Sequence, residues 1–277
     1  MGTRTGMEMA GVPGDAASGQ ETSGGGGFEV FPSVHVADGR VVHLVGDGHV
    51  PEVGRTDPLQ VALAFQEQGA RWLHLVVAED DGDSDGGLLQ ARRIIDAVSM
   101  DVQLMCRRGI DDDRALEAAL DTGCTRLNLG RSALTDLTWC AAAVARHGAR
   151  LGVSLPVRTG DLARGLRLAG PGGSDAGGLW DAVAVLDAAG CARYVVTDVG
   201  REGTLTGPHT GLFTEVCARS TAGVLAAGGI ASLDDLRAVA DLAPHGVEGA
   251  LVGRALYAGA FTLSEALACT GAARERD

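Results

Sequence analysis

Short apolar runs alternate with amphipathic segments along almost the whole chain from Phe28 onwards. Runs such as Trp72–Ala78 and Leu151–Val157 contain few polar residues, which is typical of strands that are covered on both faces. The segments between them place apolar residues three and four positions apart, as amphipathic helices do. The pattern therefore predicts strands and helices in regular alternation.

Eight such strand and helix units follow one another. The predicted strands are Glu29–Val36, Trp72–Ala78, Val102–Met105, Thr125–Leu129, Leu151–Val157, Arg193–Thr197, Val224–Ala227 and Gly249–Val252. The predicted helices are Pro58–Gln68, Leu88–Val98, Asp113–Thr122, Thr138–His147, Leu179–Ala189, Gly211–Ser220, one that begins at Ser232 and one that begins after Gly253. Eight parallel strands that are each followed by a helix close into a barrel, so we predict one α/β domain, a (β/α)8 barrel over residues 28–270.

Both ends of the chain lie outside this alternation. Residues 1–27 are rich in Gly, Ser, Thr and Ala and show no hydrophobic periodicity. Such a segment cannot bury enough apolar surface to order itself, so we predict a disordered N-terminal tail. Residues 271–277 are predicted to form a short C-terminal tail.

Two glycine turns near the C-terminus have the form of a phosphate site. Gly228 and Gly229 follow one predicted strand, and Gly253 and Arg254 follow the next. Glycine lets the backbone approach an anion closely, and the first N–H groups of a helix favour negative charge. In a (β/α)8 barrel the loops after strands seven and eight form such a site. The same glycines also suit ordinary turns between strands and helices, so the pattern leaves that alternative open.

The N-terminal half of the chain repeats these turns about 120 residues earlier. Gly109 corresponds to one turn, and Gly130 with Arg131 to the other. Two half-barrels with one phosphate turn each predict a ligand that carries a phosphate at either end. Arg107 and Arg108 stand where the C-terminal half has small residues, and their side chains either grip an anion or close the site.

The composition of the chain limits the binding partners and the cellular location that we expect. With 36 acidic and 23 basic residues, the net charge is -13, which repels nucleic acid and anionic membranes. No apolar run approaches the length of about eighteen residues that a membrane span needs. The six cysteines are scattered without a C-x-x-C pair, so neither a zinc site nor a disulfide framework is indicated. We expect a cytoplasmic monomer that binds neither nucleic acid nor membranes.

An acidic segment, Glu79–Asp85, matches only part of a calcium-binding loop and lacks its closing glutamate. We therefore expect a solvated loop there and no metal site.

Several longer motifs resemble one enzyme family. They are Phe31–Val34, Gly123–Gly130, Gly190–Asp198, Gly203–Pro208 and Gly246–Gly253. These segments resemble the HisA family, and within it the bifunctional actinobacterial PriA form, over about Phe28 to Thr270. The resemblance implies a duplicated half-barrel that isomerises a phosphoribosylamino-imidazolecarboxamide of histidine biosynthesis, and in bifunctional members phosphoribosylanthranilate of tryptophan biosynthesis. Both reactions are Amadori rearrangements that need no cofactor or metal.

The residues that carry the family's chemistry are changed in this chain. The aspartate base that ends strand one is replaced by His35, and the aspartate acid after strand six by Glu202. A further aspartate that ends strand five falls on Pro156, and an arginine after strand one becomes His43. The resemblance therefore implies a retained scaffold with an altered acid and base.

The altered set still allows acid and base chemistry. Imidazole titrates near neutrality, so His35 can act as a base, and Glu202 can act as an acid where burial keeps it protonated. Thr197 and Asp198 keep the family's residues, and the barrel places them across the mouth, where Asp198 could orient His35. A histidine at a strand end is also commonly a hydrogen-bonded core residue, and a glutamate beside an arginine is commonly a solvated pair.

Two functions of different classes remain open. The first is an active isomerase of a phosphorylated riboside that uses His35 and Glu202. The second is a paralogue that binds such a ligand without turnover and has a regulatory or interaction role. A lyase or synthase that depends on lysine is excluded, because the chain contains no lysine.

Overall fold

The computed structural model describes residues 1–2, 27–45, 48–51, 57–78, 86–107, 109–159 and 165–271. Within them, eight parallel strands close into a ring in which β12 pairs with β1 and β7 pairs with β10. In ring order the strands are β1 (Glu29–Ala37), β4 (Trp72–Val77), β5 (Asp101–Cys106), β6 (Arg126–Leu129), β7 (Leu151–Arg158), β10 (Arg193–Asp198), β11 (Gly223–Ala227) and β12 (Val247–Val252). The predicted (β/α)8 barrel is confirmed.

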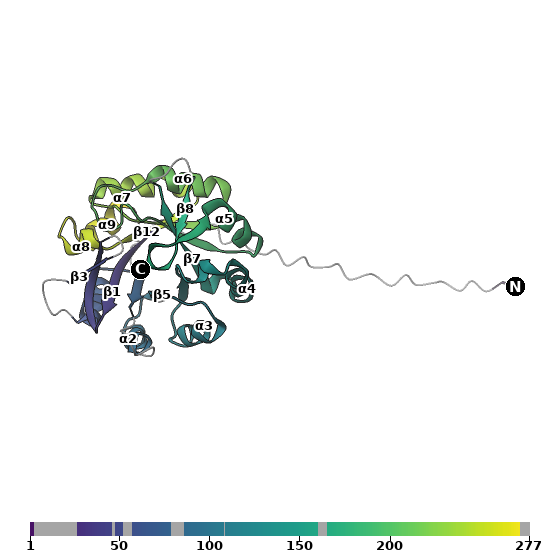
Figure 1. Ribbon diagram of the computed structural model, residues 1–277, viewed down its shortest axis with the longest axis horizontal. Helices are drawn as coiled ribbons and strands as arrows, with labels where there is room; N and C mark the ends of the chain where they lie inside the picture. The colour runs from purple at the N-terminus through teal and green to yellow at the C-terminus, as the bar shows by residue number, and fades with distance from the viewer. Residues whose placement is uncertain are drawn as a thin grey trace.

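Helices surround the ring of strands on its outside (Figure 1). They are α1 (Pro58–Glu67), α2 (Gly86–Ile95), α3 (Asp113–Leu120), α4 (Leu137–His147), α5 (Leu179–Ala188), α6 (Thr210–Arg219), α7 (Leu233–Ala240), α8 (Arg254–Tyr257) and α9 (Leu263–Cys269). Short 3-10 turns lie at Ala133–Thr135, Gly148–Arg150, Pro171–Gly173 and Ala243–His245. Several helices begin where a side chain caps the first turn, as Asp57 does for α1 and Ser232 for α7.

Each half of the barrel carries an antiparallel extension that the sequence pattern did not predict. In the first half β2 (Arg40–Val45) pairs with β1 and with β3 (Gly48–Pro51). In the second half β8 (Arg167–Ala169) pairs with β7 and with β9 (Asp175–Gly178). Because both extensions follow the first strand of their half, they support the duplication inferred from the glycine turns.

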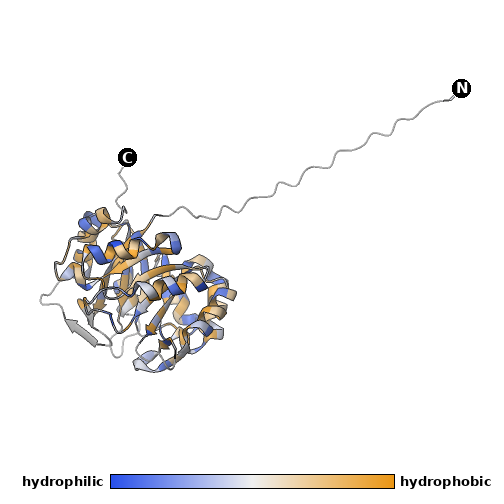
Figure 2. Cartoon of the chain, turned by 90° about the horizontal axis from the view of Figure 1, so that it is seen from above, coloured by the Kyte–Doolittle hydropathy of each residue, from blue (hydrophilic) through white to orange (hydrophobic). Residues whose placement is uncertain are grey.

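The core has two parts. The larger packs the outer faces of the strands against the helices, and Figure 2 shows strands that are mostly hydrophobic within helices of mixed character. The smaller lies inside the barrel and joins Phe31, Val195, Leu225, Ala227 and Leu251. These residues come from β1, β10, β11 and β12, so one side of the barrel interior is apolar.

Some predictions fall outside the residues that the structure describes. They concern most of the N-terminal tail (residues 3–26), the acidic segment 79–85, the C-terminal residues 272–277 and Arg108. In the part of the chain that is described, no helix has the length and apolar character needed to cross a membrane.

Candidate functional site

A cavity of about 310 Å³ opens among the carboxyl ends of the barrel strands. Its walls include residues of β1, β4, β7, β10 and β12, and also of the loops that follow the strands. In a (β/α)8 barrel this end of the strands is where catalytic residues lie. The cavity is therefore the candidate active site.

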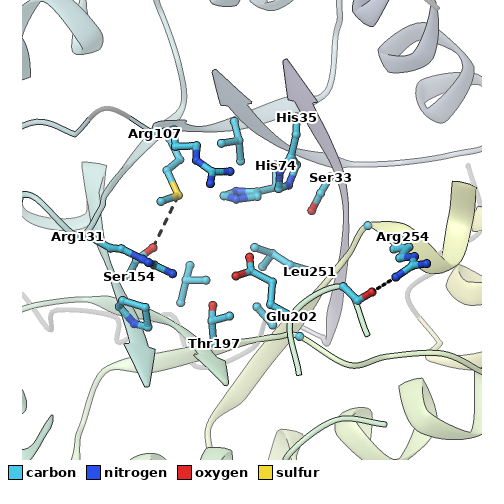
Figure 3. Close-up of a pocket in the computed structure, with 18 of the residues that line it drawn as sticks. Ser33, His35, His74, Arg107, Arg131, Ser154, Thr197, Glu202, Leu251 and Arg254 are labelled. Carbon is cyan, nitrogen blue, oxygen red and sulfur yellow. Dashed lines mark hydrogen bonds between the residues drawn. The ribbon is translucent and has the colours of Figure 1, made fainter. Parts of the chain in front are cut away.

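Two histidines and one glutamate face each other across this cavity (Figure 3). His35, near the end of β1, lies edge to face with His74 of β4, with 6.4 Å between ring centroids and 73° between ring planes. Glu202 points into the cavity from the opposite side (Figure 3). Thr197 of β10 also lines the wall, so three of the four predicted catalytic residues meet in one place.

The fourth, Asp198, is 2% exposed and is not among the cavity-lining residues. Its carboxylate lies 2.8 Å from Nδ1 of His209 and accepts hydrogen bonds from Thr159 Oγ1 at 3.2 Å and Gly200 N at 3.0 Å. Arg201 Nε lies 3.7 Å from the same carboxylate. These contacts bind Asp198 to the β10–α6 loop and to Thr159 after β7, so its predicted effect on His35 would have to be indirect.

The loop that carries Glu202 is attached to the barrel at several points. Within the loop, the Arg201 guanidinium donates to the Gly207 carbonyl at 3.0 Å, and the Gly207 N–H attaches the loop to the β11–α7 turn by donating to the Gly229 carbonyl at 2.9 Å. The Arg254 side chain donates to the Gly203 carbonyl. The loop and both C-terminal glycine turns therefore form one connected unit around Glu202.

The two C-terminal glycine turns lie at the same cavity, because Gly228, Gly229, Gly253 and Arg254 all line it. Gly228 and Gly229 have positive φ angles of 95° and 84°, which favour glycine.

At the start of α7, side chains already bind some of the backbone N–H groups that an anion could use. The N–H groups of Ala231 and Ser232 both donate to Asp235 Oδ2, at 2.9 and 3.0 Å. The Asp235 N–H in turn donates to Ser232 Oγ, so an anion at this turn would have to use amides other than those of Ala231, Ser232 and Asp235. The phosphate site itself stays a prediction.

In the N-terminal half, arginine side chains line the cavity and the predicted glycines do not. Arg107 and Arg131 line the cavity and share one side of it (Figure 3), whereas Gly109 and Gly130 do not line it. A Cβ atom on Gly109 would lie 1.8 Å from Ser132 Oγ, so this glycine makes room for a side chain at the wall. Binding of a second anion and closure of the site both stay predictions for these arginines. His43 lies in β2, but its side chain is outside the described part.

The family model described as histidine biosynthesis protein matches residues 29–262. The chain belongs to this family. A phosphoribosyl-imidazole-4-carboxamide isomerase of Nocardia farcinica is 50% identical over 86% of this chain and 97% of its own length. Proteins named phosphoribosyl isomerase A are 49% identical in Mycobacteroides abscessus, over 86% of this chain and 97% of theirs, and 48% identical in Streptomyces griseus, over 88% and 99%.

The family resemblance inferred from the motifs is thus confirmed. Pro156, at the position where the resemblance implies an aspartate, lines the cavity but offers it no acidic group. No cluster of three or more His, Cys, Asp or Glu that could hold a metal occurs among the residues the structure describes.

Sequence reasoning missed several residues of the site. His74 lies in a predicted strand, at a position that alternation with Trp72 and Val76 directs inward, and that alternation could have revealed it. His209, the partner of Asp198, carried no comparable signal, because it lies in a loop eleven residues further on.

Proposed function

We propose that this chain is a phosphoribosyl isomerase that acts on the imidazolecarboxamide ribotide of histidine biosynthesis, here called the ribotide. The observation that carries the proposal is that one cavity joins the glycine turns of β11 and β12 to His35 and Glu202. The names and about 50% identity of the relatives support the same reaction.

In this proposal the phosphate of the reacting phosphoribosyl group lies at Gly229 and Gly253, and its ribose reaches the centre of the cavity. Protonated Glu202 gives its proton to the ring oxygen as the C1–O bond breaks and the ribose opens to a protonated imine at C1. Unprotonated His35 then removes the proton from C2, the C2–H electron pair forms the C1–C2 double bond, and the π electrons of the C1–N bond return to the nitrogen, which gives a neutral enolamine. Protonation at C1 and loss of the hydroxyl proton at C2 give the aminoketose, so the molecular formula is unchanged.

The reaction is expected to be slow. Glutamate is one methylene longer than aspartate, and a misplacement of about 1 Å can cost about a hundredfold in rate. Phosphoribosylanthranilate is proposed as a second, weaker substrate, because members of the resembled PriA form use both.

The decisive experiment is an assay of the purified protein with each of the two ribosides, beside the Nocardia farcinica relative as a positive control. Slow turnover of the ribotide that disappears in a Glu202→Gln variant supports the proposal. If there is no turnover but calorimetry shows ribotide binding, the chain is instead a ligand-binding paralogue. If the ribotide neither binds nor reacts, the proposed function is wrong.

The proposal also includes a cytoplasmic monomer that needs no cofactor. Light scattering of the purified protein would test the oligomeric state, and activity after dialysis against a chelator would test the independence from metals.

A further inference from the structure

The barrel interior has a polar side opposite its apolar cluster. His74 of β4, Gln103 of β5 and Arg126 of β6 come from three adjacent strands, and they are 4%, 0% and 7% exposed. The strand register places His74 beside Gln103, and Gln103 beside Arg126. Only His74 of the three lines the cavity, so Gln103 and Arg126 lie behind it.

Hydrogen bonds connect these three side chains in a fixed direction. Arg126 Nη1 donates to Gln103 Oε1 at 3.0 Å, and Gln103 Nε2 lies 3.0 Å from His74 Nδ1. A guanidinium can only donate, so the Gln103 oxygen must face Arg126 and the Gln103 NH2 group must face His74. The NH2 group can only donate as well, and His74 Nδ1 must therefore accept.

This requirement determines the tautomer of His74. A neutral ring that accepts at Nδ1 carries its proton on Nε2. A protonated ring would place an N–H against the Gln103 NH2 group, and burial also lowers the pKa of His74, to about 3. Within the described residues, His74 makes no hydrogen bond at Nε2, and its ring lies at the cavity wall beside His35 (Figure 3).

Arg126 is itself held in place. Its guanidinium lies over the Trp72 ring, 4.5 Å from the centroid. Such stacking stabilises the cation and fixes the plane of its donors. Because the guanidinium has no acceptor atom, Arg126 sets the direction of the hydrogen bonds that run from it through Gln103 to His74.

We propose that His74 is a further catalytic residue: a neutral imidazole that donates its Nε2–H to a hydroxyl oxygen of the opened ribose, in a tautomer imposed by Arg126 through Gln103. This role rests on the proposed isomerase function. The two histidines then have different roles: His35 exchanges a proton with the substrate, whereas His74 donates a hydrogen bond and keeps its proton. A fixed donor next to the carbon that reacts stabilises charge that develops on the adjacent oxygen.

The tautomer can be tested without turnover. In protein labelled with 15N-histidine, His74 is assigned by the signals that disappear in a His74→Gln variant. At neutral pH the expected spectrum shows a protonated Nε2 and an unprotonated Nδ1. The near-isosteric Gln103→Glu variant puts a carboxylate, which only accepts, against Nδ1, so the proton is expected to move to Nδ1. A wild-type ring that is protonated at Nδ1 would overturn the proposal.

The contact with substrate is tested by kinetics and binding. His74→Leu is expected to lower kcat/KM about 100-fold, whereas His74→Gln, which keeps an N–H donor near the position of Nε2, is expected to stay within about tenfold of the wild type. Gln103→Glu should lower kcat in the wild-type background and have no further effect in the His74→Gln background. Equal activity of the wild type and His74→Leu, or a Gln103→Glu effect that persists without His74, would contradict the proposal.

If the protein shows no turnover, the contact between His74 and the ribotide can still be tested separately from the proposed function. The ribotide is then titrated into the labelled protein, with the backbone amides of Gly229 and Gly253 as reporters of occupancy. A shift of the His74 Nε2 signal together with these amides supports the contact although the isomerase function fails. Amide shifts without a change at His74 overturn the contact.

Discussion

The two histidines of the cavity have different surroundings although their rings are neighbours. His74 is buried and its Nδ1 is engaged from behind, and burial lowers its pKa to about 3. His35 lies nearer the rim and is partly exposed. His74 is therefore neutral near pH 7, and a proton that the reaction takes up there has to go to another group. His35, whose ring centroid lies 6.4 Å from that of His74, is an imidazole at the same cavity.

His35→Ala is expected to abolish turnover and leave ribotide affinity within a few fold, because the proposed phosphate turns belong to β11 and β12. In the wild type, kcat/KM should fall as pH drops through roughly 6 to 7, where an unperturbed imidazole takes up a proton and ceases to be a base. Steady-state kinetics across pH, with calorimetry on the variant, checks both. Turnover that survives the substitution would show that another group is the base.

His74 should also make the stability of the protein depend on pH. The unfolded chain binds a proton at this histidine below about pH 6.5, whereas the folded chain does so only near pH 3. The unfolded state thus binds more protons in this window, so stability falls as pH falls, by about 1.4 kcal/mol per pH unit for one group.

Urea unfolding of the wild type and of His74→Gln at several pH values between 7 and 4 measures this effect. All other titrating groups are shared, so below pH 6.5 the wild type should lose stability more steeply than the variant. Parallel slopes would mean that His74 is protonated in the folded protein.

At the scale of elements, the β11–α7 glycine turn is constrained by the neighbouring β10–α6 loop. A Cβ atom on Gly229 would lie 2.1 Å from the carbonyl oxygen of Gly207. The β11–α7 turn can therefore approach the β10–α6 loop only because residue 229 has no side chain. The same contact positions the loop that carries Glu202.

Gly229→Leu is expected to weaken ribotide binding, because the side chain would separate the turn from the loop and move the amides that would bind phosphate. Gly259→Leu is the matched control: its φ is +66°, compared with +84° at Gly229, but no atom lies within 4 Å of its Cβ position. The control should lose about 1 kcal/mol of stability and keep its affinity. Calorimetric titration of both variants decides, and unchanged affinity in Gly229→Leu would refute a phosphate site at this turn.

The sequence predicts an element best when the residues that determine it are neighbours in the chain. The barrel strands were predicted because a strand covered on both faces is apolar throughout, and the boundaries of β1 and β4 differ from prediction by one residue. The strand β2 was missed although Asp38 and Gly39 both adopt positive φ, as two-residue hairpin turns require. That aspartate and glycine pair was a readable signal.

The site depended more on contacts between distant residues. Gln103 is 29 residues from His74, and no local pattern reveals that one fixes the tautomer of the other. Asp198 looked like a partner for His35 because both end barrel strands, but the β10–α6 loop folds back and offers it His209. Strand positions are thus predictable from short apolar runs, whereas hydrogen-bond partners can be identified only in the closed barrel.

At the scale of the whole molecule, the charge of the cavity is opposite to that of the chain. The net charge is -13, yet among the described residues that line the cavity are Arg107, Arg131 and Arg254 and the single carboxylate of Glu202. A positive cleft in a negative molecule attracts small anions, while larger polyanions are repelled by the remaining surface. This distribution suits a phosphorylated riboside.

The chain is not expected to replace a missing HisA enzyme in a histidine auxotroph at normal expression. Three positions at which the resemblance implies aspartate hold His35, Pro156 and Glu202, so flux through the step should fall short of growth demand. Weak growth should return at high expression, because turnover is slowed rather than absent, and the Nocardia farcinica relative serves as the positive control. A second strain carrying His35→Asp with Glu202→Asp should grow better than the wild-type chain, since both changes restore the acid and base of the resembled family. Full growth supported by the unaltered chain at normal expression would show that an imidazole base and a longer acid work as well as two aspartates in this barrel.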